Sequence, residues 1–132
     1  MVPSASVKAS VSIFSVGQAK ASPGLPVGWL ICVEGPEKGR EHRVLAGRNF
    51  AGRGLGMDIC LSADPEIHQN DQFSIVYDPQ SLSFSVVPGK GGLTQLNGET
   101  LSGAAELHDY DTIRAGKTAL MLRSFCGEAF QW

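Results

Sequence analysis

The 132-residue sequence lacks several features that would place it in familiar functional classes. No stretch approaches the roughly 20 apolar residues of a membrane-spanning helix, and the first residues lack the basic-then-apolar order of a secretory signal. There is no long run of one charge, and the net charge of −2 argues against a general nucleic-acid binder, which needs a basic face. We therefore expect a cytoplasmic chain with no membrane insertion and no nucleic-acid partner.

The sequence also lacks the usual signatures of metal sites and hydrolytic enzymes. Cys32, Cys60 and Cys126 sit singly inside apolar runs without Cys-x-x-Cys spacing, and their odd number favours reduced thiols over a set of disulfides. No two histidines have metal-ligand spacing, and there is no Gly-x-Ser-x-Gly nucleophile elbow. These absences predict a protein that is not an enzyme and that uses no metal and no cofactor.

Residues 1–27 differ in composition from the rest of the chain. They contain six serines, three prolines and two lysines, but no acidic residue and no threonine. One interpretation is a flexible leader. The other is that residues 11–16 add a strand to an exposed sheet edge of this chain or of a neighbour. We expect residues 1–27 to form the leader and residues 28–132 to form one domain.

The domain part shows no convincing helical periodicity and reads instead as short strands separated by turns. Asn97-Gly98 is the strongest hairpin signal, because a type I′ turn needs positive φ at both central residues. Leu82, Phe84 and Val86 alternate as one face of a strand would. The expected strands lie at 29–33, 41–45, 49–53, 58–61, 73–77, 82–87, 93–96, 105–107, 112–114 and 118–125. This pattern predicts an all-β sandwich of about ten or eleven short strands in two sheets.

A glycine-rich stretch around Arg53 separates two of these strands and has two interpretations. Glycines leave backbone N–H groups uncovered, so residues 52–56 can present donors to an anion beside the arginine fork. Alternatively, this is an ordinary strand connection whose arginine pairs with Asp58 or Asp64. On this stretch alone the second interpretation is favoured, because Gly-Arg-Gly is common in turns.

The order of several short motifs resembles a forkhead-associated (FHA) domain of bacterial type over roughly residues 28–125. The matching pieces are Glu34-Gly35-Pro36, Lys38-Gly39, Gly52-Arg53, residues 57–61, Asp64, Leu96-Asn97-Gly98-Glu99, Leu107, residues 110–113 and Gly116. The resemblance implies an FHA-type β-sandwich whose loops at one end bind phosphothreonine peptides, usually downstream of Ser/Thr kinases.

The resemblance also implies which residues form the phosphopeptide site. Gly52 and Arg53 match the family's glycine and phosphate-contacting arginine. His68 and Gln69 stand where the family has a Ser-Arg pair, Gln72 stands near the family's buttressing histidine, and Gly92 replaces an asparagine. The candidate site consists of Arg53, Gly54, His68, Gln69, Lys90, Gly91 and Gly92. Since few contacts match, we expect weak or degenerate phosphothreonine recognition.

The side chains around this site carry both positive and negative charges, with opposite effects on phosphate binding. Lys90 adds a point charge, residues 89–92 offer open backbone donors, and a protonated His68 can donate to phosphate. The flanking carboxylates of Asp64, Glu66 and Asp71 offset this positive field.

The alternative function is a phosphate-independent scaffold or oligomerisation module, for example in secretion-system assembly. It would use the leader or the aromatic tail of residues 125–132, which either docks onto the sandwich or contacts a partner or a second copy. Among the other histidines, His42 is expected to be solvated on a polar strand face.

Overall fold

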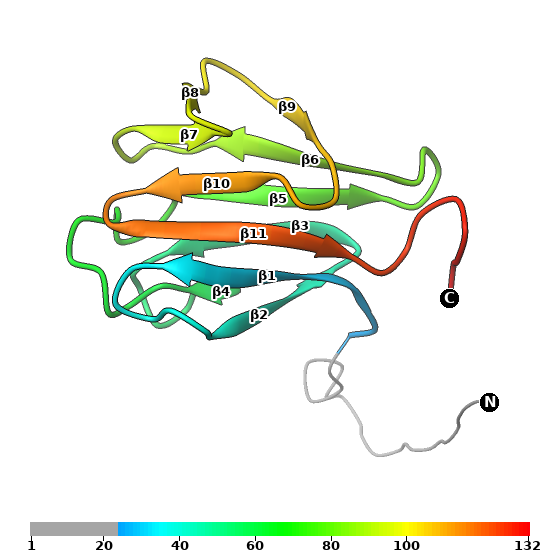
Figure 1. Ribbon diagram of the computed structural model, residues 1–132, viewed down its shortest axis with the longest axis horizontal. Coiled ribbons are helices and arrows are strands. Elements are labelled where there is room, and N and C mark those ends of the chain that lie inside the picture. The colour runs from blue at the N-terminus through cyan, green and yellow to red at the C-terminus, as the bar shows by residue number, and fades with distance from the viewer. Residues whose placement is uncertain (1–23) are drawn as a thin grey trace.

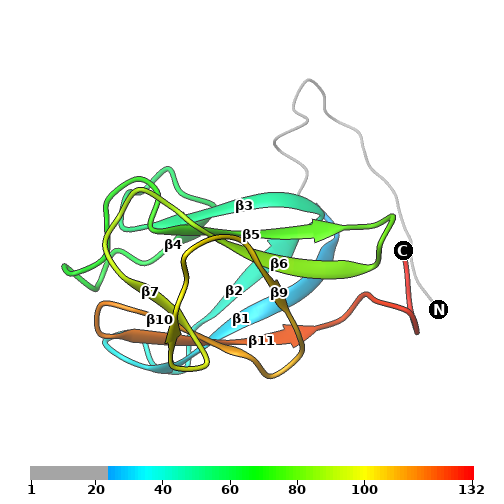
Figure 2. The ribbon, with the colours of Figure 1, turned by 90° about the horizontal axis from the view of Figure 1, so that it is seen from above.

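The computed structural model describes residues 24–132, which form two stacked β-sheets (Figures 1 and 2). The eleven strands are β1 (Pro26–Glu34), β2 (Glu41–Leu45), β3 (Gly47–Gly52), β4 (Ile59–Cys60), β5 (Phe73–Asp78), β6 (Ser83–Pro88), β7 (Thr94–Leu96), β8 (Glu99–Thr100), β9 (Ala105–Leu107), β10 (Thr112–Ala115) and β11 (Thr118–Ser124). The expected all-β sandwich is confirmed. Within this part of the chain, no helix has the length and apolar character that a membrane crossing needs.

The two sheets differ in size and share no strand. The larger sheet has the order β2-β1-β11-β10-β7-β8, and the smaller has the order β4-β3-β5-β6-β9. The pairs are antiparallel except β3 and β4, which run parallel. Strand β1 begins at Pro26, so the sandwich includes the last residues of the expected leader. The expectations for residues 1–23 lie outside the described residues.

Period-2 alternation along the strands builds the core between the sheets. In β1, Leu30 and Cys32 are buried, while Trp29 and Ile31 on the other face are only partly covered. The core includes Leu30, Val44, Ile59, Phe73, Ile75, Tyr77, Val86, Ile113, Leu120 and Leu122. All three cysteines are free, and burial raises the pKa of the Cys32 and Cys126 thiols.

Two turns test the strand boundaries that were predicted from the sequence. Asn97 and Gly98 have φ of 51° and 89°, so the expected hairpin between β7 and β8 is confirmed. The expected strand at 82–87 is wrong at its first residue. Leu82 has φ of 56° and closes a turn in which its N–H donates to the Asp78 carbonyl at 2.8 Å.

His42 is buried, and the expectation of a solvated side chain is wrong. It lies on the inward face of β2, where its Nε2 is 3.6 Å from Oε1 of Glu37 in the β1–β2 loop. This loop covers the imidazole from solvent. Burial lowers the pKa of His42 more than the nearby Glu37 carboxylate raises it.

The aromatic tail docks onto the sandwich. The Phe125 ring lies 5.9 Å from that of Trp29, 4.8 Å from that of Phe130 and 5.6 Å from that of Trp132, measured between centroids. The Trp132 indole N–H donates to the Pro26 carbonyl at 2.7 Å. The last described residues thereby close the end of the sandwich at which β1 begins (Figure 1).

Candidate functional site

The loops β3–β4, β4–β5 and β6–β7 meet at one end of the sandwich, on the left in Figure 1. Arg53 N–H donates to the His68 carbonyl at 3.0 Å, and Gly54 N–H donates to the Gln69 carbonyl at 2.7 Å. These two bonds align the first two loops side by side. They bring together four of the candidate residues, namely Arg53, Gly54, His68 and Gln69.

The glycines in these loops allow the backbones to approach closely. A Cβ on Gly54 would lie 2.9 Å from the Gln69 carbonyl oxygen, and one on Gly91 would lie 2.3 Å from the His68 Cβ. Both distances are too short for a side chain. Gly91 therefore joins the candidate cluster by packing directly against His68.

The same packing takes up two of the backbone donors that were expected to be open between residues 89 and 92. Gly89 N–H donates to the Gln72 carbonyl at 3.1 Å, and Gly91 N–H donates to the Asp71 carbonyl at 3.2 Å. The N–H groups of Arg53 and Gly54 are also occupied, as described above. Within residues 24–132, the N–H groups of Lys90 and Gly92 form no hydrogen bond, so backbone donors for an anion remain at these two residues.

Arg53 is the cation placed at the centre of these loops. Its Nε donates to the Ile67 carbonyl at 3.1 Å, which fixes the stem of the half-buried side chain. Within residues 24–132, the terminal nitrogens of Arg53 form neither a hydrogen bond nor an ion pair. The guanidinium therefore keeps its forked pair of donors for a ligand.

The alternative pairing of Arg53 with Asp58 or Asp64 is wrong, because both carboxylates are occupied elsewhere. Asp58 Oδ2 accepts from the Phe50 N–H at 2.8 Å. Asp64 Oδ2 accepts from the N–H of Lys117 and the hydroxyl of Thr118, both at 2.7 Å.

His68 exposes its imidazole beside this arginine-bearing loop. Its Nδ1 accepts from the Asn70 N–H at 3.3 Å. In the neutral ring, the proton then resides on Nε2, which can donate to a ligand without protonation of the ring.

Gln72 is a structural residue whose full role the sequence did not reveal. The side chain is 2% exposed. Its Oε1 accepts from the His68 N–H at 2.7 Å, and its Nε2 donates to the Leu93 carbonyl at 3.3 Å and to the Thr94 hydroxyl at 3.0 Å. One buried amide therefore connects the β4–β5 and β6–β7 loops. That Gln72 takes the place of the family's buttressing histidine stays a prediction.

Asp64 plays a similar part on the other side of the β4–β5 loop. The carboxylate is 1% exposed and accepts from the Glu66 N–H at 3.0 Å, in addition to the two bonds from the β10–β11 segment. Burial raises its pKa, but the Thr118 hydroxyl and the two backbone N–H groups outweigh burial and lower it. The ionised side chain thus ties the site loop to the β10–β11 turn.

The remaining candidates sit at the rim of this end. Lys90 and Gln69 have exposed side chains, and a Cβ on Gly92 would meet nothing within 4 Å. Their roles in binding stay predictions.

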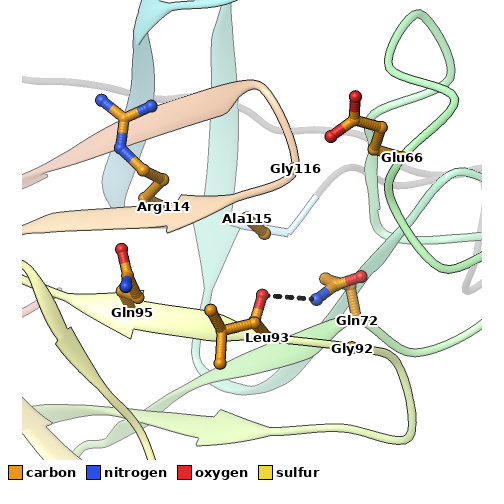
Figure 3. A pocket seen from close by; sticks show the side chains of 8 residues that line it. All are labelled: Glu66, Gln72, Gly92, Leu93, Gln95, Arg114, Ala115 and Gly116. Carbon is orange, nitrogen blue, oxygen red and sulfur yellow. Dashed lines mark hydrogen bonds between the residues drawn. The ribbon is translucent and has the colours of Figure 1, made fainter.

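A pocket of about 320 Å³ opens beside the loops. Figure 3 shows its lining residues, with Glu66 across the opening from Gln95 and the Gln72 amide pointing at the Leu93 carbonyl. Its charged groups are paired, since Glu66 lies 3.8 Å from Lys117 Nζ and Arg114 pairs with Glu34. The pocket is large enough to take one side chain of a ligand that lies across the loops.

The structure resembles many solved structures of one fold family. It matches the FHA domain of a hypothetical protein from Arabidopsis thaliana with 24% identity and a TM-score of 0.66, covering 89% of this chain and 100% of the other. The chain has the FHA fold. It also matches the N-terminal FHA domain of S. cerevisiae Rad53p, solved with a phosphothreonine peptide, with 17% identity and a TM-score of 0.65 over 75% of this chain and 94% of the other.

A third match is a domain of a secretion-system protein. The cytoplasmic domain of PscD, a type III secretion sorting-platform protein of P. aeruginosa, matches with 18% identity and a TM-score of 0.61 over 80% of this chain and 84% of the other. No protein-family model matches the sequence, and no curated protein matches it. Within residues 24–132, no group of three or more His, Cys, Asp or Glu side chains could hold a metal ion.

Proposed function

We propose that this chain is a non-enzymatic interaction module that binds phosphothreonine peptides weakly, in cytoplasmic Ser/Thr kinase signalling. The observation that carries the proposal is the state of Arg53. Its Nε is fixed by the Ile67 carbonyl, and its terminal nitrogens have no partner among the described residues. A guanidinium held in this way loses little side-chain freedom when it binds a phosphate bidentately.

Four further features support the proposal. His68 offers Nε2–H as a neutral donor on the neighbouring loop. The pocket beside Leu93 can accept a residue adjacent to the phosphothreonine. Solved FHA domains with the same fold include one in complex with a phosphothreonine peptide. The free thiols of the described residues fit a reducing compartment such as the cytoplasm.

Weak binding follows from what the site lacks among the described residues. The backbone amides of Arg53, Gly54, Gly89 and Gly91 are used inside the protein. Nearby Glu66 and Asp71 are acidic and offset the positive charge. Arg53 must therefore supply most of the phosphate affinity.

The test is fluorescence anisotropy of the full chain with a degenerate phosphothreonine peptide library and with the unphosphorylated library. We expect phosphate-dependent binding that weakens by about 10- to 100-fold in Arg53→Ala, because a charge-assisted hydrogen bond contributes about 1.5–3 kcal/mol. Arg48→Ala is the matched control, since it removes an arginine near the start of β3, whereas Arg53 follows the end of β3; the Arg48 Nε donates to Ser74 Oγ at 3.0 Å.

Binding that is indifferent to phosphate and to Arg53, or no binding at all, would overturn the proposal. Phosphate-independent binding would instead support the scaffold function.

A further inference from the structure

An apolar groove lies at the end of the sandwich opposite the candidate site. It has a volume of about 450 Å³ and is lined by Leu25, Val27, Leu45, Ala46, Tyr77, Pro79 and Trp132, together with Gly24 and Gln131. Leu25 and Trp132 on its walls are 58% exposed each, while Val27 and Tyr77 on its floor are buried. Apolar side chains that are exposed together around a hollow mark a binding surface more clearly than scattered ones do.

The first described residues run along this groove. Gly24 packs so closely against Leu45 that a Cβ would lie 2.8 Å from Leu45 Cδ1. Its carbonyl accepts from Arg43 Nη1 at 3.1 Å, which fixes the backbone where residues 1–23 join the sandwich. The chain therefore passes from residues 1–23 into the sandwich beside the groove.

The preceding sequence contains a segment of matching chemistry. Residues 11–16 read Val-Ser-Ile-Phe-Ser-Val, so four of the six are apolar. Seven residues lie between Val16 and Gly24, and the eight extended steps that join these two Cα atoms span at most roughly 29 Å. This is enough for the segment to fold back onto a groove that begins at Gly24.

Charge contributes little to the same pairing. Residues 1–23 contain Lys8 and Lys20 and no acidic residue. The exposed Asp78 borders the groove, between Tyr77 and Pro79, and attracts these lysines, whereas the Arg43 guanidinium beside Gly24 repels them. Interactions between exposed charges are small, so the docking rests on apolar contacts.

We propose that residues 11–16 dock into this groove of the same chain, with Ile13 and Phe14 filling the space between Leu25, Leu45 and Trp132. A short tether gives the segment an effective concentration on the order of millimolar, so a weak apolar contact suffices for occupancy. The docked segment covers the exposed Leu25 and Trp132. This proposal is independent of phosphopeptide binding at the other end.

The experiment is NMR spectroscopy of the full chain without any peptide. We expect NOEs from the Phe14 ring to the methyl groups of Leu25 and Leu45. In Ile13→Ser/Phe14→Ser, the Trp132 indole N–H signal and the Leu25 and Ala46 amide signals shift, while those of Gly54 and Gly91 stay in place. Val2→Ser/Val7→Ser makes the same chemical change outside the segment, and we expect it to leave the groove signals unmoved.

Groove signals that do not respond to Ile13→Ser/Phe14→Ser would overturn the proposal. So would NOEs found only between differently labelled molecules, or shifts that disappear on dilution, because a second copy would then be the occupant. Pairing of residues 11–16 with a sheet edge would give backbone NOEs to an edge strand instead, and would also contradict docking in the groove.

Discussion

The two ends of this sandwich are closed by different kinds of interaction. At the loop end, buried Asp64 and Gln72 connect the loops through directional hydrogen bonds. At the opposite end, Phe125 packs against Trp29, Phe130 and Trp132 through ring contacts, and hydrogen bonds from Gln131 and Trp132 add to this packing. Hydrogen bonds to backbone groups fix where loop atoms lie, whereas aromatic packing covers surface without specifying backbone positions so tightly.

This difference explains which groups remain available to bind a partner at each end. The loop end uses several of its backbone donors internally and leaves the Arg53 fork. The opposite end leaves apolar surface at Leu25 and Trp132. The comparison therefore predicts an anion-binding end and an apolar docking end, and the following substitutions test it.

Asp64→Asn should have the largest effect on stability. The substitution removes a buried charge that accepts three hydrogen bonds and turns an amide donor toward existing donors. We expect the free energy of unfolding to fall by about 2–4 kcal/mol, measured by urea denaturation. Asp78→Asn, at an exposed carboxylate with one local hydrogen bond, should change it by less than about 1 kcal/mol. Equal effects of the two would show that Asp64 does not hold the loop end together.

Gly91→Ala and Gly92→Ala form a matched pair in one loop. The new Cβ at residue 91 would lie 2.3 Å from His68 Cβ, whereas residue 92 faces open space. We expect Gly91→Ala to destabilise the fold by about 1–3 kcal/mol, to weaken phosphopeptide binding and to speed amide exchange at His68. Gly92→Ala should do none of these. Identical behaviour of the two variants would mean that the loops are not packed as described.

Trp132→Ala tests the other end. The side chain is 58% exposed, so we expect a loss of only about 1 kcal/mol, from its ring contacts and the bond to the Pro26 carbonyl. Amide exchange at His68 and peptide affinity should not change, because the tail lies at the far end of the sandwich. A clear change in amide exchange at His68 or in peptide affinity would show that the two ends are coupled.

The smallest expected effect is the pH dependence caused by His42. Burial lowers the pKa of His42 in the folded state, so the unfolded chain binds more protons below its ordinary value of 6.5. Stability therefore falls as the pH drops through 6.5 toward the folded pKa, and His42→Gln should flatten this part of the profile. The lowered pKa of Asp64 adds a second loss below about pH 3.8. A free energy of unfolding that increases as the pH is lowered from 7.5 to 5.5 would contradict the burial of His42.

The fold was predictable because its signals are local. Asn97-Gly98 specifies a turn by its own backbone preferences, and alternation along β1 specifies the buried face. Leu82 was misplaced since alternation alone does not show where a turn ends. His42 was misplaced because the loop that covers it comes from outside the strand.

The site was predictable only in part. Arg53 was located by its glycine neighbours and by the resemblance to the FHA family. The link between Asp64 and Thr118 spans 54 residues, and no local pattern indicates it. The glycines were expected to donate to an anion, but the N–H groups of Gly54, Gly89 and Gly91 bond to a neighbouring loop. Composition does not show which acceptor a backbone N–H will meet.

The most direct test of the central claim is the affinity of Arg53→Lys for a phosphothreonine peptide. Lysine keeps the positive charge but loses the planar fork and the Nε bond to the Ile67 carbonyl. If the fixed fork carries recognition, Arg53→Lys should bind roughly as weakly as Arg53→Ala, about tenfold or more below the wild type. Wild-type affinity in Arg53→Lys would contradict the account, because charge alone would then suffice.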